Sequence, residues 1–113
     1  MNAEARELEV FIENDGTLYR QRGLPIIRNL VLKMVQGKYD STKAVKLYMY
    51  LVDDGAKKYA KESGGADWSR MFPKATRETV AKSLVKGFED EAKLGNYDSH
   101  IPKKYKHLSL RKR

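Results

Sequence analysis

Basic side chains at helical spacing are the strongest candidates for a functional site in this sequence, and the function that they suit is the binding of a polyanion. Lysines and a tyrosine recur on one arc of a long helical segment, and arginines cluster ahead of a proline. Lysine and arginine neutralise phosphates and release their counterions. The candidate contact residues in the body of the chain are Lys43, Lys46, Tyr50, Lys57, Lys61, Arg20 and Arg22.

Positive charge is concentrated at the end of the chain. The net charge is +8, from 23 Lys and Arg against 15 Asp and Glu. Residues 96–113 hold six of those basic residues and a single acid, Asp98, so we expect a flexible cationic extension that attracts DNA or RNA with little sequence preference. The candidate contact residues of this tail are Lys103, Lys104, Lys106, Arg111, Lys112 and Arg113.

A solvated face is the alternative interpretation of the lysine arc. Asp53 and Asp54 lie within it, and each has a lysine four positions later, Lys57 and Lys58. Adjacent helical residues diverge by about 100°, so the two acids are poorly placed as a metal or acid/base pair. We expect them to form surface ion pairs with those lysines.

Catalytic and metal-binding patterns are not found. There is no cysteine, and the two histidines, His100 and His107, lie in the basic tail without a partner at ligand or triad spacing. Aligning Gly16 with the obligatory glycine of an EF-hand places Phe11 and Arg22 at the first and twelfth positions, where carboxylates are required. The sequence therefore predicts no enzyme, no metal and no cofactor.

The elements that must position the basic residues are helices. Apolar residues recur at helical spacing, no segment alternates in the manner of a strand, and the chain length suits a single core. We predict an all-α, compact bundle of about four helices over 3–14, 17–36, 41–62 and 74–94. The second is broken or kinked near Gly23–Pro25, because proline donates no backbone hydrogen bond. The predicted division is a helical domain, 1–95, and a basic, largely irregular tail, 96–113.

The third helix is predicted to be central. Its wide apolar surface indicates contact with several neighbours, and Gly55 in its middle indicates close approach of another helix. Trp68, Met71 and Phe72 make the next connection too apolar for a free linker, so we expect them to plug one end of the bundle.

A short sequence occurs twice, as GKYDS at 37–41 and GNYDS at 95–99. Each copy follows an amphipathic helix, so each glycine can take the left-handed position beyond the helix end. Asp40 or Ser41 can then cap the next helix. Helix-ending chemistry is the favoured interpretation, and a true duplication or a pair of binding loops remains open.

Two hypotheses about function follow. The first is a small cytoplasmic helical accessory protein that associates with nucleic acid through its basic surface and tail. The second is a protein interaction module, either a homodimer or an inhibitor or adaptor of a larger partner, since the seven tyrosines and one tryptophan could supply interface anchors. No run of apolar residues predicts a membrane span, and the acidic first residues do not resemble a signal peptide. The composition has the general character of phage or plasmid accessory proteins, without a motif that names a family.

Overall fold

The computed structural model describes residues 1–108 and 110, and helices joined by loops and turns make up most of it. Within those residues there is no strand, and the predicted all-α fold is confirmed. The elements are α1 (Ala3–Glu13), α2 (Gly16–Leu18), the π-helical turn η1 (Tyr19–Gly23), α3 (Leu24–Val35), α4 (Ser41–Glu62), α5 (Trp68–Met71), α6 (Lys74–Lys93) and the 3₁₀ turns η2 (Asp98–His100) and η3 (Lys103–Tyr105).

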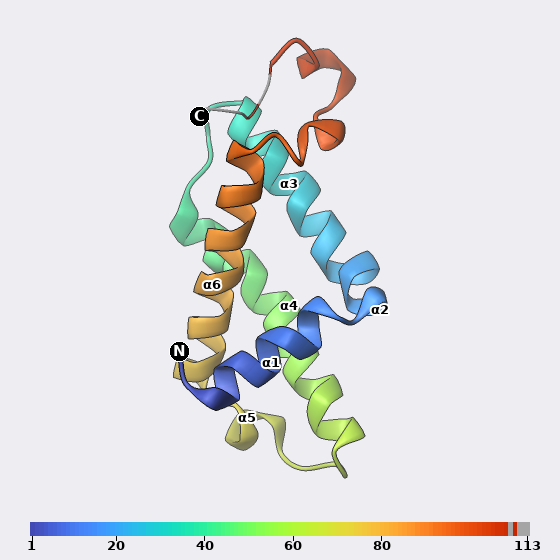
Figure 1. Ribbon diagram of the computed structural model, residues 1–113, viewed down its shortest axis with the longest axis vertical. Helices are drawn as coiled ribbons and strands as arrows, with labels where there is room; N and C mark the ends of the chain where they lie inside the picture. The colour runs from blue at the N-terminus through green and yellow to red at the C-terminus, as the bar shows by residue number, and fades with distance from the viewer. Residues whose placement is uncertain (109, 111–113) are drawn as a thin grey trace.

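Helix α4 is the centre of the molecule, as its wide apolar surface predicted. It packs along α6, is crossed by α1 and is touched by α5 and by the segment from α2 to α3. Figure 1 shows α3 and α6 far apart at the level of α2 and α1 and converging toward the end where the tail lies, so that they form the two arms of a fork. The result is an elongated molecule of 49 × 24 × 19 Å, tightly crossed in one half and forked in the other.

The predicted interruption near Gly23–Pro25 is a widened turn within a continuous helix. From Tyr19 to Gly23 the backbone is π-helical, and Leu24 N–H donates to the carbonyl of Tyr19, five residues earlier. Gly23 and Leu24 keep right-handed helical angles, so the chain neither stops nor leaves the helix. A π turn absorbs the ring of Pro25 and its missing N–H because it widens the backbone ahead of it.

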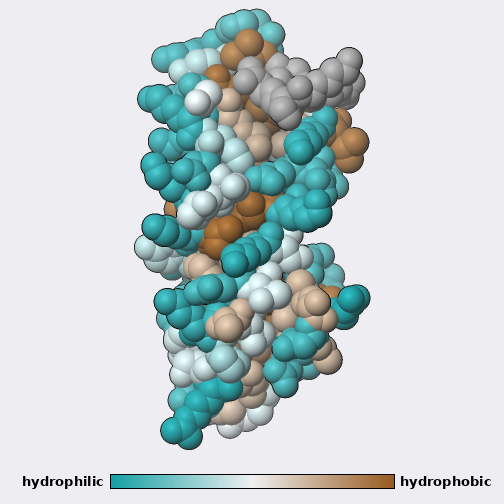
Figure 2. Space-filling view, turned by 90° about the vertical axis from the view of Figure 1, so that its left-hand side faces the viewer, coloured by the Kyte–Doolittle hydropathy of each residue, from teal (hydrophilic) through white to brown (hydrophobic). Residues whose placement is uncertain are grey.

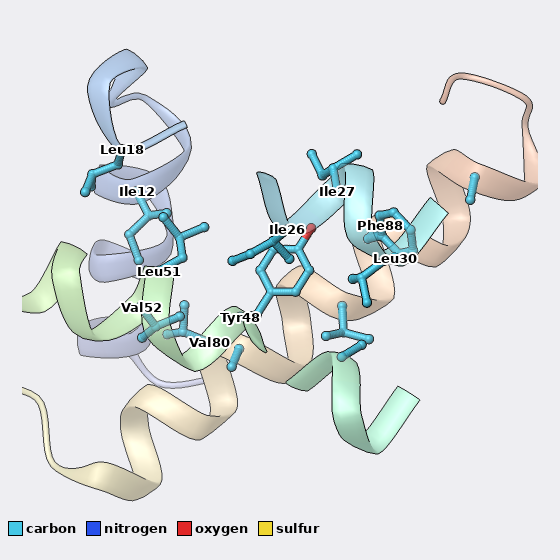
Figure 3. Packing of buried hydrophobic residues seen from close by; sticks show 14 of the residues in the cluster. Ile12, Leu18, Ile26, Ile27, Leu30, Tyr48, Leu51, Val52, Val80 and Phe88 are labelled. Carbon is cyan, nitrogen blue, oxygen red and sulfur yellow. The ribbon is translucent and has the colours of Figure 1, made fainter. Parts of the chain in front are cut away.

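The core is made of aliphatic side chains from every long helix together with the buried ring of Phe88. Leu8 of α1, Val31 of α3, Val52 of α4 and Val80 of α6 are inaccessible to solvent. Figure 3 shows residues from these helices meeting around Tyr48. None of the described buried residues is charged. The residues that fill the interior are therefore the apolar ones that recur at helical spacing in the sequence.

Gly55 has the role predicted for it. A Cβ atom at this position would lie 2.5 Å from Cγ1 and 2.9 Å from Cδ1 of Ile12, so α1 crosses directly over it. Only glycine lets the two backbones approach this closely. The crossing fixes α1 against the middle of α4.

Both copies of the repeated sequence end a helix. Gly37 and Gly95 have positive φ angles of 71° and 82°, and at each end the residue after the glycine donates its N–H to a carbonyl five residues back. This is the Schellman arrangement. Asp40 then caps α4 through the N–H groups of Thr42 and Lys43, as predicted.

The two repeat tyrosines also share a partner. The ring of Tyr97 stacks on Phe88 with centroids 5.4 Å apart, and the ring of Tyr39 lies 6.0 Å from the same phenylalanine. The hydroxyl of Tyr39 donates to Glu89 at 2.6 Å. Two turns that are far apart in the sequence therefore close over one residue of α6.

The connection between α4 and α6 covers one end of the bundle, as predicted from its aromatic residues. Phe72 is buried and its ring meets Tyr59 edge-to-face at 5.2 Å. Trp68 is half-buried beneath Arg77, whose guanidinium lies 4.6 Å from the ring centroid. Figure 1 places α5 at the end opposite the tail.

The tail is anchored to the bundle, whereas the sequence predicted a flexible extension. Its backbone is irregular apart from η2 and η3, but Ile101 and Leu110 are buried and belong to the main core. Asp98 accepts a hydrogen bond from Leu110 N–H at 3.2 Å. Spaced apolar residues among the lysines hold the chain down, and their signal is weak in the sequence because they follow no helical period. The predicted contacts Arg111, Lys112 and Arg113 lie outside the described residues.

Candidate polyanion-binding surface

The structure separates the predicted contact residues into two basic surfaces. The first is the α4 stripe, formed by Lys43, Lys46, Tyr50, Lys57 and Lys61, all of which are exposed. The second lies at the far end of the molecule, where the tail crosses the ends of α3 and α6 (Figure 1). The two arginines predicted near the proline belong to neither.

The two arginines lie in the turn that enters α3. Arg22 pairs with Asp54 of α4 at 2.5 Å, and this contact ties η1 to the central helix. Arg20 bends back over α2, since a Cβ at Gly16 would meet its Nη1 atom at 3.1 Å. Arg22 therefore holds the helix entry against α4.

The ion pairs expected within α4 are formed with other elements instead. Asp53 pairs with Arg77 of α6 at 2.5 Å, and Lys58 pairs with Asp15, also at 2.5 Å. An arginine from a neighbouring element is a better partner than a lysine one turn away, because its planar fork is held in place and donates several hydrogen bonds. The prediction that these acids are paired is confirmed, and the predicted partners are wrong.

A hollow runs beside the α4 stripe, between α4 and α6. Its volume is about 620 Å³, and it is lined by Val45, Met49 and the edge of Tyr50, with Lys46 and Lys82 on its rims. Figure 2 looks onto the side where these helices lie together and shows an apolar patch between bands of hydrophilic side chains. Tyr50 is 61% exposed, which is unusual for so large a side chain.

Lys57 differs from the other lysines of the stripe because its ammonium lies 5.1 Å from the centroid of Trp68. The ring of Trp68 thus contacts the cations of both Lys57 and Arg77. A cation held over an aromatic ring is less free to reach a phosphate. Lys43, Lys46 and Lys61 form no ion pair with a described residue. The free charge of the stripe is therefore smaller than the sequence indicated.

The second surface, here called the basic end, consists of Lys38, Lys103, Lys104 and Lys106 around Tyr105. A hydrogen bond with Gln36 at the end of α3 lowers the pKa of Tyr105, and the charges of Lys104 and Lys38 lower it further. Lys104 lies 5.3 Å from the centroid of the tyrosine ring. Tyr105 of the tail therefore lies next to Gln36 at the end of α3 and close to the charges of Lys104 and Lys38.

Lys38 was missed by the sequence analysis. It occupies the variable position of GKYDS, which was assigned only to ending a helix, and no spacing rule relates it to Lys103 or Lys104. Lys106 of the same surface donates to the carbonyl oxygens of Asp98 and Ser99, both at 3.2 Å. These bonds fix the tail turn from which the other lysines project.

The remaining chemistry of the described residues is limited. They contain no group of three or more His, Cys, Asp or Glu side chains that could hold a metal ion. No helix that the structure describes combines the length and apolar character needed to cross a membrane. The chain matches no known family model, no curated protein and no solved structure.

Proposed function

We propose that this protein is a non-catalytic accessory protein that binds DNA or RNA through the basic end. The observation that carries the proposal is the packing of the tail: buried Ile101 and Leu110 hold it against the bundle, where the charges of Lys104 and of Lys38 at the α3 end both act on Tyr105. Two segments that are far apart in the sequence thereby contribute lysines to one folded surface.

A folded basic surface binds a polyanion better than a free chain of the same charge. Lysines that are already gathered lose less conformational freedom on binding, so more of the electrostatic attraction remains as affinity. Their charges act within a Debye length of about 8 Å at physiological salt, which favours a compact cluster. The lysine ammonium is a point charge and lacks the planar guanidinium with which arginine recognises base edges. We therefore expect the lysines to contact phosphates with little dependence on the base sequence.

The basic end is favoured over the α4 stripe because of the acids around each. The stripe contains Asp53 and Asp54, and its groove is also lined by Glu78. At the basic end the acid of the tail, Asp98, accepts the N–H of Leu110 and is partly withdrawn from the surface. No other acid lies among the described residues of the tail, so its lysines keep most of their field for phosphates.

Fluorescence anisotropy with labelled single- and double-stranded oligonucleotides across a series of NaCl concentrations tests this proposal. The triple variant Lys38→Ala, Lys103→Ala, Lys104→Ala is expected to bind at least ten-fold more weakly at about 50 mM salt, with a salt slope reduced by roughly two to three units. The matched control Lys43→Ala, Lys46→Ala, Lys61→Ala removes the same charge from α4 and should stay within a few-fold of wild type.

Two outcomes would contradict the proposal. Equal losses in both triple variants would show that total charge, and not the basic end, governs binding. Absence of any binding by the wild-type protein at low salt would exclude nucleic acid as a partner.

A protein interaction module is the second candidate, favoured by the exposed ring of Tyr50 beside the apolar hollow of α4 and α6. Tyrosine next to apolar side chains is a common interface anchor. If this face joins two copies of the chain, light scattering should give a dimer mass that Tyr50→Ala converts to a monomer mass. A monomer at all concentrations would exclude the homodimer.

A further inference from the structure

A second hollow lies in the fork between α3 and α6. Its volume is about 550 Å³, which is within the range of small-molecule sites, roughly 300–1,000 Å³. Ile27 of α3, Leu51 of α4, and Leu84 and Phe88 of α6 supply apolar lining, and α1 borders it through Ile12. Figure 1 shows these helices arranged around this region, with α4 crossing between α3 and α6.

Three tyrosines from three separate elements line this hollow, here called the tyrosine pocket. Tyr19 comes from η1, Tyr48 from α4 and Tyr97 from the turn after α6. Tyr19 is 45% exposed and stands at the mouth, whereas Tyr48 is only 5% exposed and lies at the floor. Aromatic rings from different directions thus surround one space.

The hydroxyl of Tyr48 has no hydrogen-bond partner among the described residues. Buried hydroxyls normally find one, because an unmet hydrogen bond is costly. No described polar side-chain atom is both fully buried and unpartnered, so this oxygen retains access to the pocket. Figure 3 shows the ring rising from α4 with its hydroxyl directed toward the space between Ile27 and Phe88.

The charge of the pocket is opposite to that of the protein. Glu9, Glu13, Asp90 and Glu91 line it, and no lysine, arginine or histidine does, in a chain with a net charge of +8. Glu9 and Glu13 form no ion pair with a described residue, and Asp90 has only a long 3.9 Å contact to Lys86. Partial burial, followed by the charge of Glu9, raises the pKa of Glu13, as expected for a carboxylate without a cation.

We propose that the tyrosine pocket binds a small organic cation, an ammonium group on an aromatic or aliphatic body. The apolar lining accepts the body, the tyrosine faces attract the ammonium through their quadrupoles, and the acidic rim supplies the opposite charge. The unpartnered hydroxyl of Tyr48 offers a hydrogen-bond acceptor at the floor. This site goes beyond the basic end, which lies at the tail and carries the opposite charge.

The tyrosines contribute as neutral rings. Burial raises the pKa of Tyr48, and the neighbouring hydroxyls of Tyr97 and Tyr19 raise it further. Burial also raises the pKa of Tyr97, with smaller contributions from Glu91 and Tyr19. The hydroxyls of Tyr48 and Tyr97 therefore stay protonated at neutral pH, and the negative charge of the pocket comes from its carboxylates.

Three probes of similar shape test the charge requirement: 2-phenylethylammonium, neutral 2-phenylethanol and anionic 3-phenylpropionate, titrated into ¹⁵N-labelled protein. The ammonium ion is expected to shift the amide signals of Gly23 and Gly87, which both line the pocket, and to bind at least ten-fold more tightly than the alcohol. The anion should produce no shift there. Equal binding of cation and alcohol, or no shift with the cation at millimolar concentration, would overturn the proposal.

Gly87 allows the pocket to be filled without disturbing the core. A Cβ at this position would meet nothing within 4 Å. Gly87→Leu is expected to abolish the shifts caused by the ammonium ion while keeping the helical spectrum and oligonucleotide binding of the wild type. Gly87→Ala, which adds one methyl group, should retain binding within about three-fold.

A second variant tests the hydroxyl of Tyr48. Tyr48→Phe keeps the aromatic ring and removes only the hydroxyl, and it is expected to weaken ammonium binding several-fold.

Retention of full affinity for the ammonium ion in Gly87→Leu would place the ligand elsewhere and overturn the proposal. Shifts at Gly23 and Gly87 that depend on protein concentration without ligand would show a second copy as the occupant, and would also overturn it.

Discussion

The two halves of the molecule use helical glycines in opposite ways. In the crossed half, Gly55 of α4 lies directly under Ile12 of α1, and an added Cβ would come within 2.5 Å of that side chain. In the forked half, Gly87 of α6 faces open space, and an added Cβ would have no atom within 4 Å apart from its chain neighbours and the backbone of its own helix. The first glycine permits a contact, and the second leaves a hollow.

This comparison shows what holds each half together. At the crossing, helices contact one another directly through α1, α4 and α6. At the fork, α3 and α6 are apart near η1 and meet at their carboxyl ends, where the two repeat turns place Tyr39 and Tyr97 on Phe88. We therefore expect the stability of the fork to depend on a few aromatic contacts around Phe88.

The largest expected effect tests the aromatic closure of the fork. Phe88→Ala should lower the free energy of unfolding by about 3–5 kcal/mol, because it removes a buried ring that both turns share. Chemical denaturation measures the loss, and hydrogen exchange should show the turns at 37–40 and 96–101 deprotected before α1. Leu94→Ala is the control: this side chain is 62% exposed, so a change within about 0.5 kcal/mol is expected.

Gly55→Ala tests the crossing. Although alanine favours helices, we expect a loss of about 1–3 kcal/mol, since the added methyl group overpacks against Ile12. A double-mutant cycle with Ile12→Ala should reveal a favourable coupling, because removing the clashing side chain makes room for the methyl group. Strict additivity would show that α1 does not press on Gly55.

The ion pair beside the crossing has a smaller, pH-dependent effect. A hydrogen bond from Lys58 and then the N–H of Leu18 lower the pKa of Asp15 below its ordinary value of 3.8. A lowered folded-state pKa stabilises the fold above that ordinary value, and the contribution is lost as the pH falls through the folded pKa.

Asp15→Asn, which keeps an oxygen for Leu18 N–H, should therefore cost about 1 kcal/mol at pH 7, where the half-exposed Lys58 limits the pair. Denaturation at pH 7 and pH 2 measures this cost, and it should shrink at pH 2. A cost that is independent of pH would contradict the ion-pair explanation.

The smallest expected effect has the opposite sign. Gly87→Ala should raise the free energy of unfolding by about 0.5–1 kcal/mol, because alanine is the better helix former and meets no neighbour. Gly55→Ala is the same substitution in another helix, and the two variants are expected to change the free energy of unfolding in opposite directions. Thermal unfolding of both variants is the measurement, and a destabilised Gly87→Ala would show that the fork is more closed than its hollow indicates.

Much of the fold was predictable because its signals are local. Helical apolar spacing identified the four long helices, the glycine of each GxYDS stretch identified a helix end, and Gly55 identified the close crossing. The π turn before Pro25 could be predicted only as an interruption, since proline forbids the regular bond without choosing its replacement.

The candidate site was less predictable because its members come from distant segments. Lys38 joins the tail lysines only after the tail folds back, and Asp53 finds Arg77 only when α6 lies along α4. No periodicity in the chain relates these positions. The tyrosine pocket likewise collects Tyr19, Tyr48 and Tyr97 from three elements, so single-sequence patterns contain no signal for it.

The amino-acid sequence by itself determined that the chain is helical, where its long helices begin and end, and that positive charge gathers near its end, because each of these depends on residues a few positions apart. Only the tertiary structure decided which lysines share a surface, that the tail is held by Ile101 and Leu110, and that acids and tyrosines enclose one hollow. The physical reason is that electrostatic interactions and the arrangement of groups around a pocket depend on distances in space. Those distances are set by the helix crossings, which are fixed by packing.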